Sequence, residues 1–240
     1  MTVPESRPSA PPSKTGWSRP RRLRICPSIL SADFARLREE IARVEAAGAD
    51  FVHVDVMDGR FVPSITFGPI VVEAVRAMTS LPLDVHLMIV EPLRHLEAFA
   101  KAGADHLTVH VEAVEDAAAA ARSIRARGIR AGLALKPKTP LDALLSALPH
   151  CDVALVMTVE PGQGGQAFLE GSLERIARVR ATIDAGAHDC LLEVDGGIGS
   201  ETAGEAASAG ADTFVAGHSI FRAPDPPAAL RALRDAIRSA

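Results

Sequence analysis

The stretch AAGADFVHVDV at 46–56 has the composition of a helix end followed by a buried strand. Two similar stretches follow it, KAGADHLTVHV at 101–111 and SAGADTFVAGH at 208–218. In each, helix-forming residues lead to a glycine, which commonly ends a helix because glycine adopts positive φ at little cost. An apolar strand then begins. We interpret the stretch as a junction from helix to strand that the chain repeats.

The spacing of these glycines indicates how many junctions the chain holds. Gly48 and Gly103 are 55 residues apart, and Gly103 and Gly210 are 107 apart. If the two gaps hold two and four units, one strand–helix unit is about 27 residues long, and eight units fit between 23 and 240. The sequence therefore predicts a (β/α)8 barrel, the TIM-barrel fold, over 23–240. An open, doubly wound sheet is the competing architecture, but it does not require eight even units.

Short apolar runs supply the strands that this fold needs. Such runs are typical of parallel strands, which are covered on both faces. The eight predicted strands are 23–29, 51–56, 83–89, 106–111, 131–136, 153–159, 191–195 and 213–217. Helical periodicity lies between them. The buried stripes are predicted to consist of Phe34, Leu37, Ile41 and Val44 in one helix, and of Leu230, Leu233 and Ile237 in the last.

Composition excludes several classes of function. Hydrophobic residues make up 48% and charged residues 23%, with one Trp and no Tyr. A chain with a net charge of −4 and few aromatic side chains is not expected to bind nucleic acid. It contains no apolar run long enough for a membrane span. Three isolated cysteines, Cys26, Cys151 and Cys190, favour a reduced cytoplasmic location and buried structural roles.

Residues 1–22 differ from the remainder of the chain. They are rich in proline, serine and arginine and have no periodic apolar pattern. Such a segment buries too little apolar surface to offset the entropy of ordering the chain. We predict a disordered N-terminal extension at 1–22 and a catalytic barrel at 23–240.

Polar residues interrupt the predicted strands near their carboxyl ends, where barrel enzymes place their chemistry. Because strand periodicity is two, His53, Asp55 and Met57 share a face, and so do His86 and Met88. Asp195 ends the seventh strand. Two imidazoles and two carboxylates at one mouth are suitable ligands for Zn²⁺, Fe²⁺, Co²⁺ or Mn²⁺. The sequence therefore predicts a site for one divalent metal ion.

Three glycine-rich turns follow the last three strands. They are PGQGG at 161–165, DGG at 195–197 and GHS at 217–219. Glycine lets backbone N–H groups close around an anion, and phosphate sites are common after the last strands of this fold. We therefore expect a phosphorylated substrate.

The loop at 59–69, GRFVPSITFGP, is apolar for a surface segment. Closure over the site, or packing on a neighbouring subunit, accounts for that composition equally well. Asp58 and Gly59 before it are typical of a turn that ends the strand, and Asp58 is also placed to steady the site.

These motifs together resemble the ribulose-phosphate 3-epimerase family. The resemblance covers nearly all of 24–240 and is carried, in order, by PSILSADF, HVDVMDGRFVPSITFGP, DVHLMI, VMTVEPGQGGQAF, EVDGGI and AGHSIF. It implies interconversion of D-ribulose 5-phosphate and D-xylulose 5-phosphate in pentose phosphate or Calvin-cycle metabolism. It also implies a homo-oligomer, either a dimer or a hexamer.

The resemblance assigns roles residue by residue. It implies that His53, Asp55, His86 and Asp195 bind the metal, with Asp55 the proton acceptor and Asp195 the proton donor. It places Met57, Met88 and Met157 around the reaction intermediate. The implied substrate and phosphate positions are Ser28, His86, Gly162, Gln163, Gly164, Gly165, Gly196, Gly197, Gly217 and His218. Three residues depart from the family pattern, namely Ser64, Gln163 and His218.

Other functions are weighed against this one. An epimerase of a hexulose phosphate such as allulose 6-phosphate keeps the same ligands. Lyases that resemble orotidine-phosphate decarboxylase carry a lysine where this chain has His86. A Schiff-base aldolase requires an inward lysine, for which Lys136 is the candidate at a strand end. A sugar-phosphate-binding protein without activity does not account for two intact carboxylates.

Overall fold

The predicted barrel is present in the computed structural model, which describes residues 22–240. Eight parallel strands form one sheet in the order β1-β8-β7-β6-β5-β4-β3-β2. The strands are β1 Arg24–Pro27, β2 Val52–Met57, β3 Leu83–Met88, β4 His106–His110, β5 Arg130–Leu135, β6 Val153–Met157, β7 Leu191–Asp195 and β8 Thr213–Ala216. Between β1 and β2 a single parallel bridge joins Ser28 to His53 and closes the barrel.

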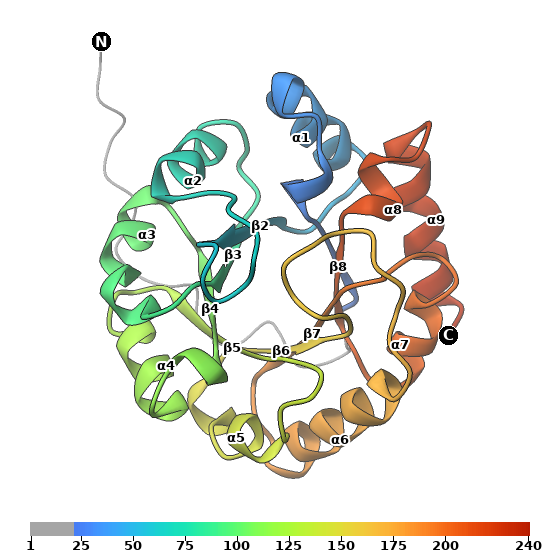
Figure 1. Ribbon diagram of the computed structural model, residues 1–240. Coiled ribbons are helices and arrows are strands. Elements are labelled where there is room, and N and C mark those ends of the chain that lie inside the picture. The colour runs from blue at the N-terminus through green and yellow to red at the C-terminus, as the bar shows by residue number, and fades with distance from the viewer. Residues whose placement is uncertain (1–21) are drawn as a thin grey trace.

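Helices surround the barrel as an outer ring (Figure 1). They are α1 Leu37–Ala46, α2 Pro69–Arg76, α3 Leu96–Ala102, α4 Ala117–Arg125, α5 Asp142–Leu145, α6 Ser172–Ala185, α7 Ala203–Ser208, α8 His218–Phe221 and α9 Pro226–Arg238. Five short 3-10 turns lie at Ile29–Ser31, Phe34–Arg36, Pro92–Arg94, Val111–Ala113 and Leu148–His150. No helix within 22–240 is long and apolar enough to cross a membrane.

The repeated AGAD sequence has a structural reason at each position. Gly48, Gly103 and Gly210 all have positive φ, as predicted for residues that end a helix. The following aspartates bind the start of a neighbouring strand. The Asp50 carboxylate accepts from the Ile25 N–H, and that of Asp212 accepts from the Leu192 N–H. Asp105 does the same for Leu83. The repeat therefore ends a helix and fixes the adjacent strand at the amino-terminal rim.

Alternate residues of each strand face opposite sides of the sheet. In β2, Val52, Val54 and Val56 join the large apolar core between the strands and the helices. His53 and Asp55 lie on the other face, inside the barrel, and are also buried. The buried charges therefore belong to the barrel interior rather than to the main apolar core.

One predicted core position is wrong. Phe34 is 52% exposed, whereas Ile41 and Val44 are buried as predicted. The reason is local, because Phe34 begins a 3-10 turn capped by the side chain of Asp33, and α1 starts only at Leu37. Its ring packs edge-on against Phe67, with 5.4 Å between centroids. The stripe predicted in the last helix is correct, since Leu230, Leu233 and Ile237 are buried in α9.

The predicted N-terminal extension lies, apart from Arg22, outside the described residues. The three cysteines are free and buried, as their isolated positions in the sequence indicate.

Candidate active site

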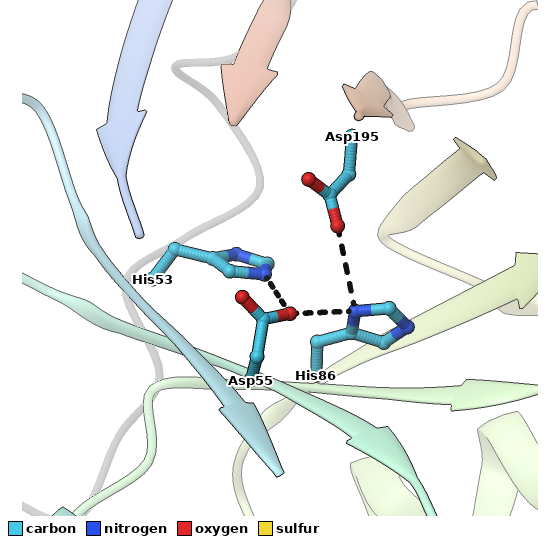
Figure 2. A group of neighbouring side chains, drawn as sticks. All are labelled: His53, Asp55, His86 and Asp195. Atoms are coloured by element: carbon cyan, nitrogen blue, oxygen red, sulfur yellow. Dashed lines mark hydrogen bonds and ion pairs between the residues drawn. The ribbon is translucent and has the colours of Figure 1, made fainter. Parts of the chain in front are cut away.

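Four ionisable side chains from three strands converge inside the carboxyl end of the barrel (Figure 2). His53 and Asp55 come from β2, His86 from β3 and Asp195 from β7. One potential ligand atom from each lies within 4.8 Å of the others. His53 Nε2 and His86 Nδ1 are each 3.2 Å from Asp55 Oδ1, and His86 Nδ1 is 3.8 Å from Asp195 Oδ2. The structure brings together the four residues predicted as metal ligands.

The pairing register of the strands produces this cluster. Asp55 lies opposite His86 in the β2–β3 ladder, and Met57 lies opposite Met88. The polar and sulfur-bearing residues therefore occupy matching levels of adjacent strands. On the other side, Met157 lies opposite Asp195 in the β6–β7 ladder. Within β2 and β3 the methionines lie one inward position beyond Asp55 and His86, nearer the barrel mouth.

Burial and the charges of neighbouring residues shift the pKa values of the clustered side chains in different directions. Burial alone opposes ionisation of Asp55, but the charges and hydrogen bonds of His53 and His86 outweigh burial and lower the pKa of this carboxyl. Burial also disfavours a charged His53, yet Asp55 and Asp84 raise its pKa well above the usual range. Burial, with the negative charge of Asp55, raises the pKa of Asp195 to about 6. The pKa of the Asp195 carboxyl group is therefore higher than that of Asp55.

Apart from His86, the predicted substrate positions lie around one cavity at this mouth. Ser28, Met57, Met88 and Met157 line it together with Asp55 and Asp195. The glycine turns line it too, through Gly162, Gln163, Gly164, Gly165, Gly196, Gly197, Gly217 and His218. The substrate and phosphate roles of these residues remain predictions, but the structure gathers them around a single space.

The loop at 59–69 folds across the mouth. Val62 is 4% exposed and packs on Met57 and Met88, and the Ser64 hydroxyl donates to the Gly162 carbonyl oxygen at 2.6 Å. Asp58 shapes the turn before the loop, because its carboxylate accepts from the backbone N–H groups of Arg60 and Phe61. Val62, together with Phe61, therefore covers the methionine-lined side of the site.

Sequence reasoning missed several hydrogen bonds of the cluster, although Ser28 itself is among the predicted substrate positions. Ser28 Oγ donates to Asp55 Oδ2 at 2.6 Å, and His53 Nδ1 lies 2.7 Å from Asp84 Oδ2. His86 Nε2 lies 2.9 Å from His110 Nε2. Parity along the strands could have identified Asp84 and His110, because each is separated by an even number of residues from other inward-facing positions.

Lys136, the candidate for a Schiff base, does not line the cavity. Its ammonium lies 3.8 Å from the centroid of the Phe61 ring and 3.4 Å from the Phe61 carbonyl oxygen. The lysine is therefore held by the loop that covers the site.

The fold and the cluster together define a (β/α)8 barrel with a possible metal-binding site beside a glycine-rich cavity. A model of the ribulose-phosphate 3 epimerase family matches residues 24–221, and the chain belongs to that family. The ribulose-phosphate 3-epimerase of Mycobacterium tuberculosis is 52% identical over 210 residues, which are 88% of this chain and 91% of the relative. That of Synechocystis is 50% identical over 216 residues, covering 89% and 94%.

Solved structures of other barrels share the fold. The 3-hexulose-6-phosphate synthase of Salmonella typhimurium superposes with a TM-score of 0.68 at 17% sequence identity, covering 90% of this chain and 99% of that one. At this identity the likeness concerns the architecture alone.

Proposed function

We propose that the protein interconverts D-ribulose 5-phosphate and D-xylulose 5-phosphate by removing and returning the proton at C3. The observation that carries this proposal is the pair Asp55 and Asp195, which approach one cavity from β2 and β7 and both approach His86 Nδ1. Inversion at carbon requires a base on one face of the substrate and an acid on the other. Two carboxyl groups on two sides of the mouth meet that requirement.

The environments of these carboxyl groups suit different roles. The lowered pKa of Asp55 keeps it ionised and able to accept a proton, and Ser28 fixes its second oxygen. The pKa of about 6 for Asp195 lets it hold and release a proton near neutral pH. We therefore assign Asp55 as the acceptor and Asp195 as the donor in one direction, with the roles exchanged in the other.

His53, Asp55, His86 and Asp195 are proposed to hold one divalent metal ion, either Zn²⁺, Fe²⁺, Co²⁺ or Mn²⁺. The residues fit such an ion, because two imidazoles and two carboxyl groups each offer a ligand atom within 4.8 Å of the others. When bound, a divalent cation stabilises the negative charge that develops on the substrate oxygens as the C3 proton leaves. Met57, Met88 and Met157 form an apolar surround that keeps water from the reacting carbon.

The glycine turns are proposed to bind the substrate phosphate. Gly165 and His218 approach one another there, since a side chain on Gly165 would lie 3.3 Å from the His218 ring. The side-chain amide of Gln166 donates to the carbonyl oxygens of Glu160 and Gln163 and so holds the 161–165 turn. This internal bracing supports an ordered phosphate loop despite the unusual Gln163.

We also propose that the protein is cytoplasmic and forms a homo-oligomer, either a dimer or a hexamer. Ile65 in the covering loop and Ile70 at the start of α2 are 81% and 82% exposed. Large apolar side chains so exposed are common where subunits meet.

The test is solvent deuterium exchange at C3 of D-ribulose 5-phosphate, with metal present. Wild-type protein should incorporate deuterium and form D-xylulose 5-phosphate, whereas Asp55→Asn and Asp195→Asn should both lose exchange. Glu160→Gln is the matched control, since Glu160 lies near the mouth but pairs with Lys138 outside the cavity. Normal exchange by either aspartate variant contradicts the assignment. Faster turnover of allulose 6-phosphate in the same assay would transfer the activity to a hexulose phosphate.

A further inference from the structure

A chain of hydrogen bonds leads from the proposed metal site to the exterior of the barrel mouth. His86 Nε2 lies 2.9 Å from His110 Nε2, and His110 Nδ1 lies 3.1 Å from Glu112 Oε2. His110 ends β4, and Glu112 lies in the following 3-10 turn, Val111–Ala113. The other ring nitrogen of His86, Nδ1, faces Asp55 and Asp195. His86 therefore lies between the carboxyl groups of Asp55 and Asp195 on one side and the His110–Glu112 pair on the other.

The donors and acceptors in the chain can be assigned. An ionised carboxylate only accepts hydrogen bonds, so His110 Nδ1 must carry a hydrogen and donate it to Glu112. When a cation occupies Nδ1 of His86, the one hydrogen of that ring is on Nε2, and His110 Nε2 must accept it. In the metal-bound state the proton between the two rings consequently belongs to His86, whereas in the metal-free protein the 3.2 Å contact between His86 Nδ1 and the Asp55 carboxylate requires a hydrogen on Nδ1.

We propose that His110 and Glu112 are positioning residues that hold His86 in the form protonated at Nε2, so that Nδ1 is available to the divalent metal. This inference rests on the proposed function, because it concerns a ligand of that metal site. A histidine ligand whose second nitrogen is held by a carboxylate or carbonyl is a general feature of metal sites. Here an intervening histidine extends the contact to a carboxylate outside the cluster.

The surroundings keep Glu112 ionised, so that it accepts from His110. Burial opposes ionisation of Glu112, but the hydrogen bonds from His110, Thr139 and the Lys136 backbone outweigh it and lower its pKa to about 2. The Phe61 ring, 4.8 Å from that of His110, covers the chain from the side of the loop.

The backbone fixes which oxygen of Glu112 faces which partner. The Lys136 N–H donates to Oε1 at 2.7 Å, and the Thr139 hydroxyl donates to the same oxygen. A backbone N–H cannot reverse its role, so the atom at the Oε1 position must be an acceptor. This requirement makes one conservative substitution informative.

Glu112→Gln should reverse the direction of the hydrogen bonds from residue 112 to His86 without moving the side chains that make them. The glutamine oxygen must take the Oε1 position opposite Lys136, which places the amide NH₂ against His110 Nδ1. His110 must then accept at Nδ1 and carry its proton on Nε2, and His86 is forced to accept at Nε2. The ring hydrogen of His86 is then confined to Nδ1, and binding of the metal there must break the reversed series of hydrogen bonds.

Metal affinity measures this effect directly, without turnover. Zn²⁺ is titrated into metal-free wild type, Glu112→Gln and Thr139→Val in competition with a chromogenic chelator. Glu112→Gln should bind Zn²⁺ roughly 10- to 100-fold more weakly than wild type, as is typical when such an outer partner is lost. Thr139→Val is the matched control, because it removes a hydrogen bond from the same carboxylate but leaves the Lys136 contact and the His110 proton in place.

A second measurement uses the wild-type protein alone and does not depend on how the variant folds. ¹⁵N NMR of the imidazoles in the Zn²⁺-loaded protein should show the His86 proton on Nε2 and the His110 proton on Nδ1. The opposite form of either ring overturns the inference, and so does equal Zn²⁺ affinity of wild type and a folded Glu112→Gln variant. Absence of Zn²⁺ binding by wild type instead overturns the proposed metal site itself.

Discussion

The Ser64 hydroxyl donates to the carbonyl oxygen of Gly162 at 2.6 Å, joining two mouth loops whose contact residues are 98 positions apart in the chain. One loop covers the methionine-lined side of the cavity, and the other is the first of the glycine turns. Ser64 is one of the residues that depart from the family pattern. The serine nevertheless makes a direct contact that holds the covering loop against the proposed phosphate site.

We expect Ser64→Ala to raise KM for D-ribulose 5-phosphate about fivefold, because a hydrogen bond of this kind contributes about 1 kcal/mol. The catalytic groups are untouched, so kcat should change less than KM. Steady-state kinetics of the variant measure both. Ser146→Ala is the control, since the Ser146 hydroxyl makes a single 3.3 Å contact to Ala143 on an exposed surface. An unchanged KM for Ser64→Ala would show that the loop closes without this contact.

The DGG turn after β7 depends on a close approach that only glycine permits. Gly197 has a φ of +66°, and a Cβ there would lie 2.4 Å from the backbone nitrogen of Phe168. Gly197→Ala therefore combines left-handed strain of about 1–2 kcal/mol with overpacking of about 1–3 kcal/mol. We expect the loops that follow β6 and β7 to separate. Inorganic phosphate should then inhibit the variant at least tenfold more weakly than it inhibits wild type.

Gly171→Ala separates these two contributions. Gly171 has a φ of +82°, but a Cβ there meets nothing within 4 Å. This variant should lose stability by the strain alone, measured by urea unfolding, and keep the wild-type inhibition constant for phosphate. Equal inhibition constants for Gly197→Ala and wild type would remove the DGG turn from the phosphate site.

The sequence predicts most of this fold because parallel strands are continuous apolar runs. The second strand, predicted at 51–56, spans Val52–Met57, and the glycines of the repeat have the predicted positive φ. Periodicity failed at Phe34, where a capped 3-10 turn precedes the helix and imitates its spacing. A pattern of apolar residues does not distinguish the first helical turn from the turn before it.

The prediction of the site succeeds where strand parity applies and fails beyond the strand ends. His53 and Asp55 share a face in any regular strand, so their meeting inside the barrel follows from spacing alone. Glu112 lies past the end of β4, where no periodicity relates it to His86. Its contact with His110 depends on the three-dimensional course of the turn. Outer partners that lie past the strand ends therefore require the structure.

Lys136 offers a direct test against Schiff-base chemistry. Its ammonium lies over the Phe61 ring, a cation–π contact worth about 0.5–1 kcal/mol at exposed sites. Lys136→Met should change KM by about fivefold or less and retain turnover, because the backbone N–H that binds Glu112 remains. Borohydride added with substrate should leave the mass of the wild-type protein unchanged. A mass increase by the reduced sugar phosphate, lost in Lys136→Met, would assign the chain to the aldolase mechanism.

Asp195 should destabilise the metal-free protein at neutral and alkaline pH. Burial and the charge of Asp55 raise its pKa to about 6 in the folded state, against about 3.9 in an unfolded chain. Between these values the unfolded chain releases the Asp195 proton while the folded protein keeps it. The free energy of unfolding therefore falls as pH rises through this window and remains lowered above it, by roughly 2–3 kcal/mol.

Asp195→Asn removes this penalty. In urea unfolding of chelator-treated protein at pH 8, the variant should be more stable than wild type by about that amount, and the difference should vanish near pH 4. Asp142→Asn is the control, because Asp142 has an 82% exposed side chain and should give no pH-dependent difference. Added Zn²⁺ should reverse the order at pH 8 by stabilising wild type more than Asp195→Asn. A variant less stable than wild type at pH 8 without metal would show that Asp195 supports the fold.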